Sequence, residues 1–148
     1  MNFIAIIPAR YQSTRFPGKP LALIQGKPMI QWVVEQAQKE LEQVYVATDH
    51  EEIARVVEAF GGKVVMTSPD HPSGTDRCAE AARILEKTVD FEVVINVQGD
   101  EPFIRPEQIR ELTDCFTPGT EIATLIRPFS DAEELENPNK PKVVIGHS

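Results

Sequence analysis

The sequence NFIAIIPARYQSTRFPGKP, residues Asn2–Pro20, begins as an apolar run and continues as a basic loop. The continuous run from Phe3 to Ile7 is typical of a parallel strand that is buried on both faces. Pro8 has no N–H to donate, so we expect the strand to end there. In open α/β sheets, the loop at the carboxyl end of the first parallel strand is a place where ligands bind.

The loop after this strand carries Arg10, Arg15 and Lys19, and no acidic residue precedes Glu35. The first 34 residues have a net charge of +4, whereas the rest of the chain holds the other 11 basic and all 23 acidic residues, for −12. Arg offers paired donors to phosphate oxygens and Lys offers a mobile point charge, so a polyphosphate ligand is predicted. The alternative is a solvated surface loop, which fits the stiffening Pro and Gly residues less well.

Composition limits the class of protein. The chain has 148 residues, of which 41% are hydrophobic and 26% charged, which suits one domain with its own core. A net charge of −8 argues against general binding to nucleic acid or to an anionic membrane. Cys78 and Cys115 form no CxxC pair, and the N-terminal apolar run is too short for a signal peptide. We therefore expect a reduced, cytoplasmic protein without a membrane span.

Helix and strand patterns alternate along the chain. Apolar residues recur with the spacing of a buried helix face after Pro28, Asp49, Ser73 and Pro106. The further predicted strands are 44–48, 63–66, 92–97, 121–126 and 142–145, and a short helical segment is predicted over 130–136. This alternation predicts an α/β fold with an open, mostly parallel sheet and helices on both faces. The pattern leaves the order of the strands open.

Polar residues at the ends of predicted elements are candidates for ligand contact. Ser73, Gly74 and Thr75 open a helix whose free amides suit an anion or a carbonyl, although ordinary capping by Ser73 or Thr75 explains them nearly as well. Asp100 follows a predicted strand and is expected to face the ligand crevice, although Gly-Asp is also common in turns. Asp49 is predicted to be either a helix cap or a ligand.

Five stretches form an ordered set of motifs. They are IPARYQSTRFPGKP with GKPM (7–20 and 26–29), ATDHE (47–51), HPSGTDR (71–77), NVQGDEP (96–102) and ENPNKPKVV (136–144). Together they closely resemble the 3-deoxy-manno-octulosonate cytidylyltransferases, the CMP-Kdo synthetases. Five motifs in one order are specific where one alone would be weak. The resemblance implies a Rossmann-like fold of the nucleotide-diphospho-sugar transferase type.

The resemblance also implies a reaction. CMP is transferred from CTP to 3-deoxy-D-manno-octulosonate with magnesium and release of pyrophosphate, for lipopolysaccharide biosynthesis. The anomeric hydroxyl attacks the α-phosphorus in line, so positioning and charge neutralisation are the main tasks of the protein. Three alternatives stay open: a cytidylyltransferase for another acidic sugar such as sialic acid, a CTP-binding module without turnover, and a chain that only associates with a partner.

Residues 1–148 are expected to form the nucleotide-binding core of such an enzyme. In the family, a further C-terminal portion binds the sugar, carries a second metal-binding aspartate and forms the homodimer. We expect that portion to be missing from this sequence, which leaves activity and dimerisation of the chain open.

The resemblance assigns roles to single residues. The predicted nucleotide-binding residues are Ala9, Arg10, Arg15, Lys19, Ser73, Thr75, Arg77 and Gln98. The basic residues of the first loop are expected to contact the triphosphate. Ser73, Thr75 and Arg77 are expected to lie near the cytosine or the ribose. Gln98 is also the predicted contact with the sugar.

The predicted catalytic residues are Arg10, Lys19 and Asp100. Asp100 is the expected magnesium ligand, because a hard carboxylate oxygen suits a hard cation. The charge of the first loop points to the same two basic residues without the resemblance, whereas the metal role of Asp100 rests on it.

Overall fold

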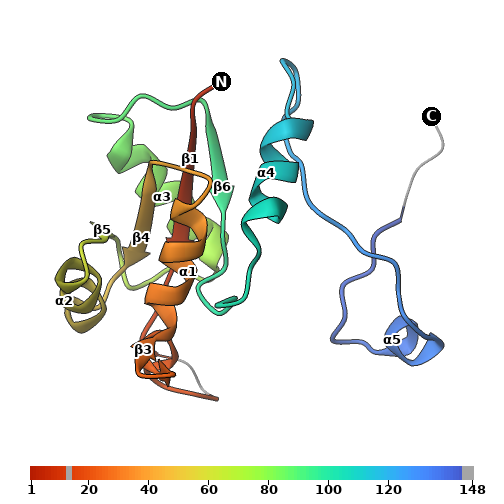
Figure 1. The fold of residues 1–148 in the computed structure, drawn as a ribbon, viewed down its shortest axis with the longest axis horizontal. Helices are drawn as coiled ribbons and strands as arrows, with labels where there is room; N and C mark the ends of the chain where they lie inside the picture. Colours follow the sequence, from red (N-terminus) through yellow and green to blue (C-terminus); the bar gives the residue numbers. More distant parts are fainter. Residues whose placement is uncertain (13–14, 145–148) are drawn as a thin grey trace.

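The main sheet is parallel, and its first strand lies between two others (Figure 1). The computed structural model describes residues 1–12 and 15–144. The strands, in the spatial order β5-β4-β1-β6, are β5 (Lys63–Met66), β4 (Val44–Thr48), β1 (Phe3–Pro8) and β6 (Val93–Asn96). In register, Ala5 lies opposite Val44 and Phe3 lies opposite Val93. The parallel sheet predicted from the sequence is confirmed.

Strand β1 runs one residue further than we predicted. Pro8 lies opposite Ala47 of β4, and the amide of Ala9 donates to the carbonyl oxygen of Ala47 at 2.9 Å. The missing N–H of a proline removes only one bond of the ladder, so pairing can continue beyond it. The start of the basic loop is therefore fixed against β4.

Helices cover both faces of the sheet, as predicted (Figure 1). The longer helices are α1 (Met29–Gln38), α2 (Glu51–Ala59), α3 (Gly74–Leu85) and α4 (Pro106–Cys115). Helix α3 packs on the face that carries Ile4 and Ile6. Apolar residues of the other three helices join the core on the face that carries Ala5 and Ile7. Because side chains alternate along a strand, β1 contributes to both cores.

A small hairpin precedes α1 and was not predicted. Its strands β2 (Leu23–Ile24) and β3 (Lys27–Pro28) are antiparallel, and a 3-10 turn, η1 (Lys19–Leu21), leads into it. Gln25 and Gly26 between the strands have φ values of 51° and 78°. Two consecutive residues with positive φ are typical of a tight hairpin turn, and Gly is common at its second position.

The strand predicted over residues 121–126 is wrong. These residues are irregular, and Ile122 and Ile126 are 89% and 55% exposed. A strand is stable only when a neighbour pairs with its backbone, and within 1–12 and 15–144 no strand pairs with this segment. At the predicted strand 142–145, residues 142–144 are also irregular, and Ile145 lies outside the described residues.

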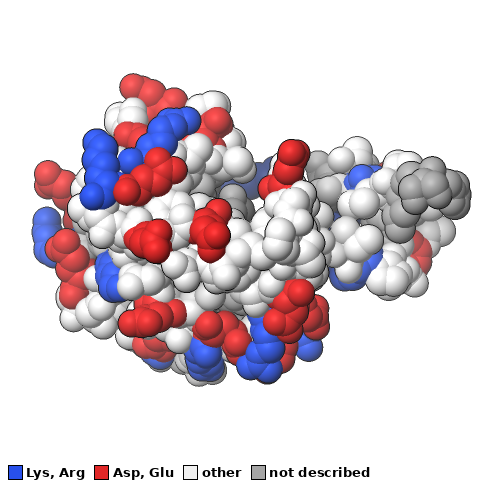
Figure 2. Space-filling model, turned by 90° about the horizontal axis from the view of Figure 1, so that it is seen from above, with Lys and Arg blue, Asp and Glu red and all other residues white. Residues whose placement is uncertain are grey.

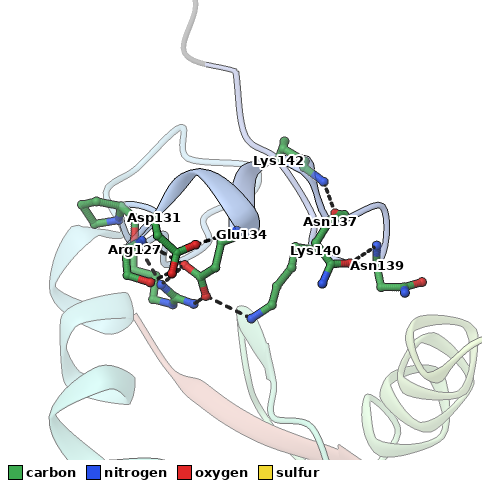
Figure 3. A network of polar contacts seen from close by, with 9 residues as sticks. Arg127, Asp131, Glu134, Asn137, Asn139, Lys140 and Lys142 are labelled. Carbon is green, nitrogen blue, oxygen red and sulfur yellow. Dashed lines mark hydrogen bonds and ion pairs between the residues drawn. The ribbon is translucent and has the colours of Figure 1, made fainter.

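The segment after α4 extends away from the sheet (Figure 1) and has its own polar contacts (Figure 3). It includes the predicted short helix as α5 (Ala132–Glu136), which Asp131 caps by accepting the N–H of Glu134 at 2.8 Å. Glu134 in turn accepts from Arg127 at 2.6 Å, from the Ser130 amide at 2.9 Å and from Lys140 at 3.1 Å. The Arg127 guanidinium and then the Ser130 amide hold the pKa of Glu134 well below its usual range.

One face of the molecule carries charges of both signs (Figure 2). Figure 2 shows Lys and Arg interspersed with Asp and Glu over one face, rather than gathered into a basic patch. Among the described helices, none combines the length and the apolar character needed to cross a membrane.

Substitution of Ile4 tests the assignment of the second core. Ile4 is 1% exposed between the sheet and α3. We expect Ile4→Ala to lower the free energy of unfolding by about 2–5 kcal/mol, because it removes buried methyl groups and leaves a cavity. Ile122→Ala is the matched control at 89% exposure, with an expected change within about 0.5 kcal/mol. Urea denaturation measures both, and equal effects would contradict the assignment.

Candidate functional site

A cavity of about 260 Å³ lies at the carboxyl edge of the sheet. Three loops surround it: the loop after β1, the loop before α3 and the loop after β6. The residues that line it are Pro8, Ala9, Arg10, Lys19, Pro20, His71, Pro72, Ser73, Gly74, Arg77, Gln98, Gly99 and Asp100. This is the position at which open parallel sheets bind ligands.

Most of the predicted site residues line this cavity, although they come from distant parts of the sequence. They are Ala9, Arg10, Lys19, Ser73, Arg77, Gln98 and Asp100. Arg15 is exposed on the first loop and is not among the lining residues. Thr75 lines a second cavity instead, which Gln98 also borders. Nucleotide contacts of Arg15 and Thr75 stay predictions.

Lys19 and Asp100 form an ion pair at the cavity. Nζ of Lys19 donates to Oδ2 of Asp100 at 3.1 Å, across 81 positions of sequence. Their side chains are 41% and 57% exposed. An exposed pair of this kind contributes only about 0–1 kcal/mol to stability. Stability is therefore a weak explanation for the pair, and both charges are accessible to a ligand.

Gly18 helps to hold the two ends of the basic loop together. Its N–H donates to the carbonyl oxygen of Tyr11 at 2.8 Å, and its φ of 70° is a left-handed conformation that favours glycine. A Cβ at this position would also lie 3.2 Å from the Tyr11 ring. That ring stacks on His50 with 4.1 Å between ring centres. These contacts hold the two ends of the loop, so that Arg10 and Lys19 both reach the cavity.

Gly99 allows the loop after β6 to approach β1. A Cβ at Gly99 would lie 2.7 Å from the carbonyl oxygen of Pro8, which is too close for any side chain. The approach brings Gln98 and Asp100 to the same cavity as the basic loop. We did not predict this approach at Gly99, although the Gln-Gly-Asp run directly after a buried strand was the available indication.

Arg77 lines the cavity, but protein groups engage its guanidinium. The side chain is buried, and Nη1 donates to Oγ1 of Thr67 at 2.6 Å and to the carbonyl oxygen of Ser68 at 3.3 Å. Nη2 lies 2.9 Å from Oδ1 of Asp49, an ion pair that lacks the alignment of a hydrogen bond. The capping role considered for Asp49 is wrong, since His50 occupies the N-cap of α2. A buried guanidinium needs a carboxylate, and Asp49 provides it.

Neighbouring residues orient two further lining side chains. Ser73 caps α3, because its Oγ accepts the amide of Asp76 at 3.1 Å and donates to the Asp76 carboxylate at 2.5 Å. The capping alternative for Ser73 is thus confirmed, although its side chain also lines the cavity. Nε2 of Gln98 donates to Oδ1 of Asn96 at 3.0 Å, which orients the amide of Gln98.

Asp100 fits one kind of metal site. Among the described residues that line the cavity it is the only acidic one, and these parts of the chain contain no cluster of three or more His, Cys, Asp or Glu that could hold a metal ion. Magnesium in nucleotide sites commonly uses one or two carboxylates and takes its other ligands from phosphates and water. A single accessible carboxylate therefore suits magnesium bound together with a nucleotide.

Comparison with known proteins confirms the resemblance found in the motifs. A family model described as "Cytidylyltransferase" matches residues 4–147. Proteins named 3-deoxy-manno-octulosonate cytidylyltransferase are 58% identical in Cytophaga hutchinsonii over 98% of this chain, 58% identical in Bacteroides thetaiotaomicron over 98%, and 52% identical in Vibrio cholerae serotype O1 over 100%. The chain spans 58–59% of the length of these curated relatives.

Solved structures agree. A structure described as CMP:2-keto-3-deoxy-manno-octonic acid synthetase complexed with CTP matches with a TM-score of 0.71 and 48% identity, over 77% of this chain and 46% of the other. A cytidylyltransferase from Leptospira borgpetersenii, 23% identical, matches in fold with a TM-score of 0.66, over 78% of this chain and 49% of the other. The fold is the α/β, Rossmann-like fold of the nucleotidyltransferases. The family model matches nearly the whole length of the chain, and the chain therefore belongs to the cytidylyltransferase family.

Proposed function

We propose that the protein transfers CMP from CTP to 3-deoxy-D-manno-octulosonate and releases pyrophosphate. The observation that carries the proposal is the cavity at the carboxyl edge of the sheet, where Arg10 and Lys19 meet Asp100. Relatives named for this reaction are 52–58% identical, and one solved relative is described as complexed with CTP. Because these relatives are named for 3-deoxy-manno-octulosonate, we also propose that the protein acts in lipopolysaccharide biosynthesis, in the cytoplasm.

In this proposal the basic loop holds the triphosphate. Arg10 presents paired N–H donors, and Lys19 a point charge, to phosphate oxygens. Lys19 leaves Asp100 for the phosphates when CTP enters, so that a weak ion pair is replaced by a contact with a more highly charged group. Ser73 and Gln98 offer hydrogen-bonding groups to the rest of the nucleotide or to the sugar.

We propose magnesium as the cofactor, with Asp100 as its protein ligand. Bound together with CTP, the ion would neutralise negative charge on the phosphate oxygens. The residues of the chain orient the α-phosphorus for in-line attack by the anomeric hydroxyl. No covalent intermediate with the protein is needed, because the sugar hydroxyl attacks directly and pyrophosphate leaves.

The reaction is tested by measuring pyrophosphate release from CTP, with and without 3-deoxy-D-manno-octulosonate. Release that depends on the sugar supports the proposal, and replacement of the sugar by sialic acid tests the other acidic substrate. CTP binding without release under any of these conditions would favour the alternative, a CTP-binding module without turnover. That alternative is kept because the chain spans 58–59% of the length of the relatives.

Removal of the Lys19 charge tests the triphosphate site. Lys19→Ala should lower turnover by roughly 10²–10³, the range seen when a preorganised charge stabiliser is removed. CTP binding should weaken as well, which isothermal titration measures in the same preparation. Lys87→Ala is the control, because Lys87 is exposed and does not line the cavity. Unchanged kinetics in a folded Lys19→Ala protein would contradict the assignment.

Asp100→Asn tests the magnesium ligand, since it keeps the shape of the side chain and removes its charge. We expect magnesium to lose its effect on CTP affinity, while the midpoint of thermal unfolding changes little because the pair with Lys19 is half-exposed. Asp114→Asn, on the exposed surface of α4, is the matched control. A large fall in thermal stability with magnesium-dependent CTP binding preserved would make Asp100 a structural residue instead.

A further inference from the structure

The loop over residues 67–72 connects β5 to α3 and forms one wall of the cavity. It contributes His71 and Pro72 to the lining, and Ser73 follows directly as the cap of α3. It is an irregular segment, so contacts from its surroundings must hold its conformation. The Thr67 amide donates to the carbonyl oxygen of Thr48 in β4 at 2.9 Å, and further contacts come from α3, the helix that the loop leads into.

Glu80 of α3 contacts both ends of this loop, and it lies about one helical turn after Arg77. Its Oε2 accepts the backbone N–H of Ser68 at 2.9 Å, and the same oxygen contacts Nε2 of His71. Arg77 supports the first end through Thr67 and Ser68. Residues three apart lie on one face of a helix, so two side chains of α3 act on the loop together.

The charge of the Glu80 carboxylate determines which group donates in its contact with His71. The contact with His71, followed by the Ser68 amide, lowers the pKa of Glu80, so the carboxylate is ionised at neutral pH. An ionised carboxylate can only accept, and Nε2 of His71 must therefore carry the proton that it donates. His71 and Glu80 side chains are 18% and 29% exposed, which protects this contact from full competition by water.

We infer that Glu80 is a positioning residue, which acts through His71 and Ser68 to hold the 67–72 loop as a wall of the nucleotide site. The inference rests on the proposed function, because it takes the cavity to be that site. Glu80 does not line the cavity and lies outside the motifs that the sequence singled out. The buried residues of α3, which include Cys78, Ala81 and Leu85, pack on the sheet without its help.

The first experiment follows hydrogen exchange at single amides in the wild type and in Glu80→Ala. We expect the Ser68 amide to exchange about ten- to hundredfold faster in the variant, as for loss of a hydrogen bond to a charged group. Amides of β1 and β4 should keep their protection. Glu80→Gln should restore part of the Ser68 protection, because its amide oxygen still accepts. Glu86→Ala, in the exposed cap position at the end of α3, is the control.

The second experiment measures the dissociation constant for CTP in the same proteins. Glu80→Ala should weaken binding about tenfold or more, and His71→Ala should weaken it by no more than this, because the Ser68 contact of Glu80 remains. The double variant should cost no more than Glu80→Ala alone, because Glu80→Ala already removes the contact that His71→Ala breaks. Additive losses, or unchanged CTP affinity once the loop is released, would overturn the positioning role.

The two experiments separate this inference from the proposed function. If the wild type binds no CTP, the proposed function fails, and the exchange rates alone then decide whether Glu80 holds the loop. Unchanged exchange at Ser68 in Glu80→Ala overturns the inference whatever the nucleotide result. Loss of protection throughout the sheet would also overturn it, since Glu80 would then be a general stability residue.

Discussion

Parallel pairing of β1 with a strand on each side is the constraint from which the site follows. Both faces and both edges of β1 are covered, so its carboxyl end has a fixed position. Parallel neighbours end at the same edge of the sheet, which makes the loops after β1, after β6 and before α3 converge there. The close contact of Gly99 with Pro8 completes this convergence, because it leaves no space for a side chain between two of the loops.

The charged groups around the cavity differ in burial and in role. Arg77 is buried and joins the ends of β4 and β5 to α3 through Asp49, Thr67 and Ser68. By contrast, the Lys19–Asp100 pair is half-exposed and contributes little to folding. The site thus combines a buried cation that is paired with protein groups and supports its walls with accessible charges that are available for ligand chemistry.

Sequence patterns predicted the elements whose formation depends on local periodicity. The apolar run of β1 and the buried stripe of α1 are examples, because burial of one side imposes a spacing that is visible in the letters. The strand expected over 121–126 failed because a strand also needs a partner, and no local pattern shows whether one is present. The capping alternative for Asp49 failed for a similar reason, since its partner Arg77 lies on another element. The cavity residues were found mainly through a family resemblance. The role of Glu80 could be inferred only from its contacts with Ser68 and His71 in the folded structure.

The alternation of side chains along β1 has a consequence for how the chain avoids misfolding. Ile4 and Ile6 face α3, whereas Ala5 and Ile7 face the opposite core. A slip of one residue against β4 would turn every one of these side chains to the other face. It would force an isoleucine into the space of Ala5 and leave the α3 side underfilled. Unequal volumes on the two faces therefore make mispaired sheets costly, and the correct alignment of the strand that carries the basic loop is protected by size as well as by hydrophobicity.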